Sequence, residues 1–250
     1  MKHATEGQAE TPMPVMEHLG ELRKRLIYCL IVLVLGLVGG LFGAQPLFDY
    51  LVAAAPVENL GLHVFSPWDA IGLYVKFAFI ISLIAAIPFT LFQLWAFVRP
   101  ALGVKEQRAT LRYIPGALLM FLVGVAFGYF IVFPMAYIFT ESVTASMGLS
   151  ETYGVTQYFS FLFNIVVPIS LLFELPLLIL FLTRIGILNP FMLQKMRKVA
   201  WFLLILIGVM ITPPDVISDL LVAIPLVVLY EISVLLSKIA YRKRLAAREK

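Results

Sequence analysis

Three glutamates occupy positions where a carboxylate could do chemistry. Glu21 and Glu106 lie in polar segments that also carry arginine and lysine, and Glu174 lies inside a long apolar stretch. The first two would suit a cationic ligand, because arginine binds carboxylates through charge-assisted hydrogen bonds. Glu21 could instead pair with Arg25 four residues further on, and Glu106 could be a solvated loop charge. Spacing alone leaves both interpretations open.

Glu174 presents a different problem, because an ionisable side chain deep in an apolar segment is costly. Such a group suggests function by default, and we expect it to be protonated or hydrogen-bonded to polar groups of a neighbour. Taken alone, Glu174 would also fit a proton-coupled carrier of small solutes, which is the alternative function.

Catalytic and metal-binding patterns are not found in the sequence. The histidines, His3, His18 and His63, all lie outside the long apolar runs, and Cys29 is the single cysteine. An intramembrane serine protease would lack its base, and neither an HExxH motif nor a GxSxG elbow occurs. The sequence predicts no enzyme activity, no metal site and no cofactor; an intramembrane enzyme stays only as a third hypothesis.

The elements that must position these glutamates are membrane helices. Of the 250 residues, 61% are hydrophobic and 14% are charged, outside the usual range of soluble domains. Six apolar runs approach the length that a helix needs to cross a bilayer. These runs are Leu26–Gly43, Phe77–Val98, Tyr113–Phe139, Tyr158–Thr183, Val199–Thr212 and Leu220–Ser237.

The basic residues predict the orientation of these helices. Of the 19 lysines and arginines, all except Lys76 fall in the N-terminal segment, in alternate loops and in the tail. The positive-inside rule places both termini in the cytoplasm of a bacterial or archaeal cell, with no cleaved leader. The net charge of +4 then reflects topology and anionic lipids rather than nucleic acid. Lys76 could reach the outer headgroups or pair with Asp69.

We expect one all-α membrane domain with kinked helices. Its predicted parts are a flexible N-terminus (1–13), a cytoplasmic amphipathic helix (14–25), six transmembrane helices (26–237) and a basic tail (238–250). Prolines in or beside most spans predict kinks and a curved wall with one concave face. Spans five and six are short; Val199–Thr212 would reach about 21 Å across a hydrocarbon core of about 30 Å. The bilayer should be thin on that side.

Together these segments resemble the TatC family of twin-arginine translocase proteins over nearly the whole chain. The motifs that carry this resemblance occur in the same order as in the family. They are HLGELRKRL at 18–26, PWDA at 67–70 with Lys76, QLWAFVRPAL at 93–102 followed by Glu106, FELP at 173–176, TPPD at 212–215, AIP at 223–225 and LYE at 229–231. Asp69 stands where the family usually has glutamate, Ala101 replaces a frequent glycine, and Asp219 replaces an uncharged polar residue.

The resemblance implies a receptor for signal peptides that carry two adjacent arginines. Such proteins help to export folded proteins, driven by the proton-motive force, together with the single-span proteins TatA and TatB in an oligomeric complex. The resemblance implies two groups of site residues. Signal-peptide binding is expected of Glu21, Glu106, Arg23, Arg25 and Gln93. Polar contacts within the membrane or with partners are expected of Glu174, Asp215, Asp219 and Lys76.

Overall fold

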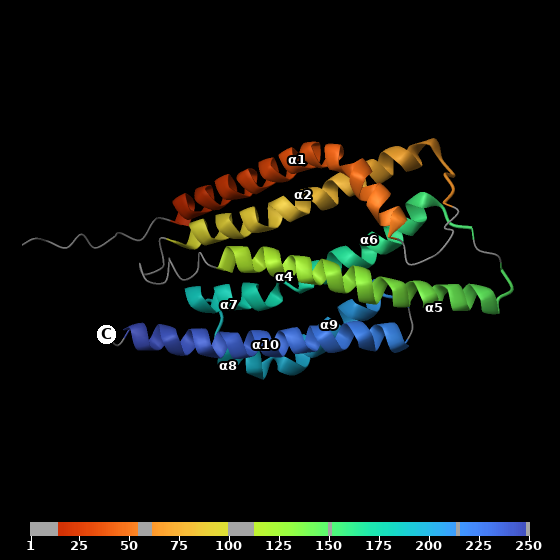
Figure 1. The fold of residues 1–250 in the computed structure, drawn as a ribbon. Coiled ribbons are helices and arrows are strands. Elements are labelled where there is room, and N and C mark those ends of the chain that lie inside the picture. The colour runs from red at the N-terminus through yellow and green to blue at the C-terminus, as the bar shows by residue number, and fades with distance from the viewer. Residues whose placement is uncertain (1–14, 55–61, 100–112, 150–151, 214–215, 249–250) are drawn as a thin grey trace, which may run out of the picture.

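The structure, a computed structural model, describes residues 15–54, 62–99, 113–149, 152–213 and 216–248. Over these residues the chain is almost entirely helical, as expected, and no β-strand is formed (Figure 1). An isolated parallel bridge joins His63 to Gly154. Two of the predicted site residues, Glu106 and Asp215, lie outside the described residues.

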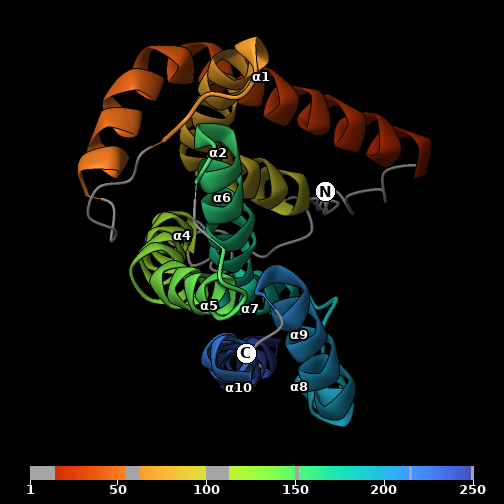
Figure 2. The same cartoon turned by 90° about the vertical axis from the view of Figure 1, so that its right-hand side faces the viewer.

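Helix α1 (Val15–Ala53) and helix α2 (Pro67–Val98) form a long antiparallel pair. The sequence analysis treats the surface helix and the first span as two segments, whereas α1 runs through both without a break. The C-terminal part of α1, which contains Pro46, turns away from the rest of the helix (Figure 2). Proline removes a backbone donor and bends a helix in this way.

The third apolar run is a single column of three pieces. Helix α4 (Tyr113–Phe127) continues through a π-helix (Gly128–Val132) into α5 (Phe133–Ser146). The amide of Phe133 donates to the carbonyl of Gly128, which is one residue further back than in an α-helix. Pro134 follows at once, and a proline ring conflicts with the carbonyl four residues before it. The wider turn accommodates the proline without ending the span.

The fourth apolar run is broken where Glu174 lies. Helix α6 (Val155–Leu172) ends just before it, and α7 (Leu175–Ile185) starts just after it with Pro176 in its first turn. Gly186, with a φ of 87°, then ends α7 in the left-handed conformation that glycine adopts easily. The break makes Glu174 a junction residue rather than a residue of a continuous helix.

Three helices complete the described chain: α8 (Pro190–Lys195), α9 (Arg197–Ile211) and α10 (Val216–Arg248). Five helical stretches in the described residues are long and apolar enough to cross a membrane. Helix α9 is not among them, because its 15 residues reach only about 22 Å. It corresponds to the predicted fifth span, so its crossing of the membrane stays a prediction.

The helices pack in layers, and several of the helices in contact are far apart in the sequence (Figures 1 and 2). Helix α1 packs mainly on α2, α2 contacts α4 and α6, and α10 packs on α7 and α9. The core between α1, α2, α5 and α6 is rich in aromatic rings; Phe77, for example, stacks edge-on against Phe48, Phe159 and Phe163. These rings fix α6 against α2, and therefore fix the position of the break that follows α6.

Close contact between α1 and α2 depends on glycine. A Cβ on Gly40 would lie 2.9 Å from Cα of Ala78, so only glycine lets the two backbones approach this closely. Nearby, the hydroxyl of Ser82 donates to the carbonyl of Leu33 at 2.6 Å. The α1–α2 pair is thereby held in a defined register, and this register determines which residues of α2 lie near Glu21 of α1.

Candidate functional site

Basic residues gather at one end of the bundle, which we call the basic end. Helix α1 begins there, and α2, α7 and α10 end there (Figure 1). These helix ends supply the basic side chains of Arg23, Lys24, Arg25, Arg99, Arg184, Lys238 and Arg242. The predicted signal-peptide residues of the described chain lie at this end.

Three of the predicted site residues are in contact; we call them the Glu21 cluster. Arg25 donates from Nη2 to Oε1 of Glu21 at 2.5 Å and from Nε to the same oxygen at 3.2 Å. Its Nη1 donates to Oε1 of Gln93 at 3.2 Å, which bridges α1 to the last turns of α2. The predicted pairing of Glu21 with Arg25 is confirmed, and Gln93 extends it to a second helix.

The Glu21 cluster is partly shielded from solvent. The side chains of Arg25 and Glu21 are 20% and 27% exposed, and Gln93 is buried. Arg23 is exposed and makes no contact with the cluster within the described part of the chain. The site is thus a carboxylate and an amide already arranged to accept hydrogen bonds from a guanidinium.

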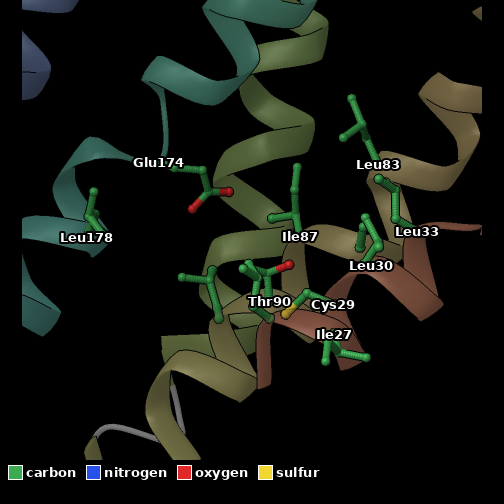
Figure 3. A pocket seen from close by; sticks show the side chains of 12 residues that line it. Ile27, Cys29, Leu30, Leu33, Leu83, Ile87, Thr90, Glu174 and Leu178 are labelled. Atoms are coloured by element: carbon green, nitrogen blue, oxygen red, sulfur yellow. The ribbon is translucent and has the colours of Figure 1, made fainter. Parts of the chain in front are cut away.

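Glu174 lines a pocket between α1, α2 and the start of α7, which we call the Glu174 pocket (Figure 3). It has a volume of about 580 Å³ and an almost wholly apolar lining, which includes Leu30, Ile87 and Leu178. Thr90 and Cys29 are the other residues with polar or ionisable side chains there. An apolar pocket with one carboxylate suits an apolar segment that brings one polar group.

The carboxylate of Glu174 makes no hydrogen bond of normal geometry within the described part of the chain, although the main chain of Phe121 in α4 lies near it. Both oxygens are inaccessible to solvent in the structure and accept no hydrogen bond there. The expected partner from a neighbouring helix is therefore not found among these residues. A buried polar group without a partner costs about 1–3 kcal/mol. This cost gives Glu174 a reason to bind a donor brought by another molecule.

Lys76 is bound to the protein in a way that the sequence did not indicate. Its Nζ donates to Oγ of Ser160 on α6 at 2.5 Å. The alternative of an ion pair with Asp69 is wrong, because Asp69 caps α2 instead. Its Oδ2 accepts from the amides of Phe65 and Ser66 at 3.0 and 2.9 Å. Asp69 therefore has a local structural role, and Lys76 joins α2 to α6.

Asp219 closes the connection between α9 and α10. Oγ1 of Thr212 lies 2.8 Å from Oδ1 of Asp219 and 3.0 Å from the carbonyl oxygen of Gly208, so its single O–H is shared between these two acceptors. The carboxylate lies in the first turn of α10, where negative charge is favourable. No contact links Asp219 to Glu174 or to the Glu21 cluster among the described residues.

A further polar cluster joins α9 to α10. Glu231 accepts from the indole Nε1 of Trp201 at 3.2 Å and pairs with Nη2 of Arg197 at 2.9 Å. The hydroxyl of Tyr230 donates to the carbonyl of Leu193 at 2.7 Å. None of these residues was among the predicted site residues. The signal in the sequence that could have found them is Glu231 itself, a glutamate within an apolar run. The clusters described so far contain no group of three metal-binding side chains, nor does the rest of the described chain.

Comparison with known proteins gives consistent matches over most of the chain. The family model of Sec-independent protein translocase protein (TatC) matches residues 17–225. The chain is 42% identical to TatCy of Bacillus subtilis (strain 168) over 231 residues, which covers 92% of this chain and 91% of the relative. It is 34% identical to TatC of Escherichia coli (strain K12) over 236 residues, which covers 92% and 90%.

Solved structures match as well. A crystal structure described as twin arginine translocase receptor TatC superposes with a TM-score of 0.74 at 34% identity, covering 89% of this chain and 99% of that one. A second, described as the same receptor in DDM, gives a TM-score of 0.76 at 33% identity and covers 88% and 99%. The resemblance seen in the motifs therefore extends to the arrangement of the helices.

Proposed function

Because this chain belongs to the Sec-independent protein translocase (TatC) family, we propose that it is the signal-peptide receptor and core scaffold of a twin-arginine translocase. In this role it exports folded proteins across the cytoplasmic membrane at the expense of the proton-motive force. It is a multi-pass protein of the inner membrane with both termini in the cytoplasm. The basic end of the bundle is then its cytoplasmic end.

The Glu21 cluster is the single observation on which this assignment depends most. Glu21 and Gln93 present a carboxylate and an amide oxygen beside each other at the basic end. A guanidinium matches this pair, because its planar fork of donors can bind a carboxylate bidentately while a further N–H reaches the amide. A lysine ammonium offers no such fork. One arginine of the signal peptide binds at Glu21, and Glu106 binds the second.

The Glu174 pocket accepts a partner. Its apolar walls suit the apolar segment of a signal peptide or the single span of TatA or TatB, and its carboxylate lacks a hydrogen-bond partner among the described residues. A polar side chain on the entering helix would supply that partner. Asp219 and Lys76, together with Asp215, contact partner proteins within the membrane and at its outer face. The short helix α9 lies where the bilayer would be thinned.

Photo-crosslinking tests the receptor function. A peptide with an adjacent arginine pair and a photoreactive residue is irradiated with membranes that contain the full chain. The Glu21→Ala, Glu106→Ala double variant should lose most of the crosslinking to a twin-arginine peptide. Glu141→Ala, an exposed glutamate in α5, is the matched control and should crosslink as wild type does. Equal crosslinking by the double variant would refute the assignment of the two glutamates.

A further inference from the structure

The guanidinium of Arg25 already occupies the acceptors of the Glu21 cluster. All three of its nitrogen atoms donate: Nε and Nη2 to Glu21, and Nη1 to Gln93. An ordinary ion pair between residues four apart on one helix would involve the glutamate alone. Here the same guanidinium also satisfies the amide oxygen on the second helix. The cluster therefore holds the chemical group that the proposed function requires it to take from a signal peptide.

The hydrogen-bonding capacity of Glu21 decides whether a second guanidinium could bind beside Arg25. A carboxylate oxygen offers two lone pairs, and Oε1 of Glu21 already accepts from both Nε and Nη2 of Arg25. Oε2 accepts no hydrogen bond from any described residue. A bidentate arginine pairs its two N–H groups with the two oxygens of a carboxylate. An incoming arginine can therefore reach Oε2 alone until Arg25 leaves.

Exchange is physically accessible because the pair is not deeply buried. The two side chains are 20% and 27% exposed. Arg25 lies in the N-terminal third of α1, and a long arginine side chain on a surface can swing toward solvent. Ion pairs with this exposure contribute little to stability, equivalent to about twofold to fivefold in an equilibrium constant. Displacement of Arg25 would thus lower the affinity for a ligand modestly without preventing binding.

We propose that Arg25 is an internal competitor that occupies the arginine site of the resting receptor and is displaced by the signal peptide. The proposal rests on the proposed function, because it concerns the regulation of the same site. It also predicts how the affinities for different peptides change together. Both an arginine and a lysine of a peptide would need the Glu21 and Gln93 oxygens that Arg25 now occupies. Displacement of Arg25 therefore lowers the affinity for either peptide by the same factor, whereas a residue that shapes the acceptors would change the preference between peptides.

Binding of labelled peptides to the full chain in detergent tests this proposal. Two peptides that differ only in the adjacent pair, Arg-Arg or Lys-Lys, are titrated and followed by fluorescence anisotropy. The key variant is Arg25→Gln. Lys24→Gln is its matched control, because Lys24 is an exposed neighbour whose loss changes the net charge by the same amount. The comparison removes the general effect of a less positive surface.

We expect Arg25→Gln to bind the twin-arginine peptide about twofold to fivefold more tightly than Lys24→Gln does. The twin-lysine peptide should gain by the same factor, so the ratio between the peptides stays constant. Arg25→Lys keeps the net charge but loses the fork, and its affinity should lie between wild type and Arg25→Gln. This second variant also guards against a folding defect caused by charge loss.

Two results would overturn the proposal. Arg25→Gln could bind no more tightly than Lys24→Gln, or it could improve the affinity for one peptide only, which would make Arg25 a positioning residue. If wild type prefers the twin-arginine peptide in either case, the receptor function stands and only the competitor role is rejected. If wild type shows no preference for the arginine pair, the receptor function and the competitor role fall together.

Discussion

Arg197 and Glu231 form an ion pair, 2.9 Å between Nη2 and Oε2, that joins the start of α9 to α10. The other carboxylate oxygen accepts from the indole of Trp201 in α9. Two side chains of α9 thus donate to the two oxygens of one carboxylate on α10. Since α9 is short and packs chiefly on α10, this cluster is a main polar link that holds it in place.

We therefore expect Glu231→Ala to lower the free energy of unfolding by about 1–2 kcal/mol, because it removes the ion pair and the indole hydrogen bond together. Glu231→Gln should cost less, since the amide oxygen can still accept from Trp201. Thermal melting of the purified protein in detergent measures both. Lys198→Ala, which removes an exposed charge next to Arg197, is the control. A Glu231→Ala variant that melts together with this control would contradict the prediction.

Gly40 should be intolerant of any side chain. Gly40→Val places a Cβ against the main chain of Ala78, so α1 and α2 must separate, at a cost of about 1–3 kcal/mol or more. Gly39→Val is the ideal control, because a Cβ at Gly39 meets nothing within 4 Å. Melting and protease sensitivity should change in the first variant alone. Similar behaviour of the two variants would show that the close approach of α1 and α2 is not needed.

Substitution of Glu174 should separate stability from transport. Glu174→Leu removes two buried oxygens that accept no hydrogen bond among the described residues, so the isolated protein should gain about 1–3 kcal/mol of stability. Export of a twin-arginine reporter in cells should fall. Glu174→Gln can still accept a hydrogen bond and should retain more export than Glu174→Leu. Full export by the leucine variant would remove Glu174 from the functional site, and Leu178→Ile in the same pocket serves as the control.

Loss of the carboxylate at Asp69 should weaken the start of α2. Asp69→Ala frees the amides of Phe65 and Ser66, and loss of a helix cap costs about 1 kcal/mol. Asp49→Ala removes an equal charge from an exposed pair on α1, where Asp49 accepts from Gln45, and should have little effect. Melting of the two variants in parallel makes the comparison. Equal melting temperatures would mean that the cap does not stabilise α2.

The sequence was sufficient to predict the helical membrane class, because apolar runs and the distribution of charge are properties of the chain alone. It also predicted that helices would be distorted near proline, but not how. Pro134 follows a π-helix that leaves its span continuous, whereas Pro176 follows a two-residue interruption, at Phe173 and Glu174, between α6 and α7. Which response occurs depends on the packing of neighbouring helices, and spacing does not report it.

The site was predictable in part. The residues of the Glu21 cluster were named together through motif resemblance, and the pairing of Glu21 with Arg25 followed from their spacing. Contact of Arg25 with Gln93, which is 68 residues away, required the register of α1 against α2. For the same reason, Ser160 could not be identified as the partner of Lys76, since they are 84 residues apart and on different helices.

The break at Glu174 also has an electrostatic consequence. Glu174 directly precedes α7 without capping it through its side chain, so the residue stands at the positive end of that helix dipole, where negative charge is favoured. A continuous helix would have placed the same carboxylate beside neutral mid-helix peptide groups. The interruption that Pro176 imposes on the fourth span thus offsets part of the cost of placing an acid at this depth. Any mutation that rejoins α6 to α7 would raise the free-energy cost of the Glu174 carboxylate without changing Glu174 itself.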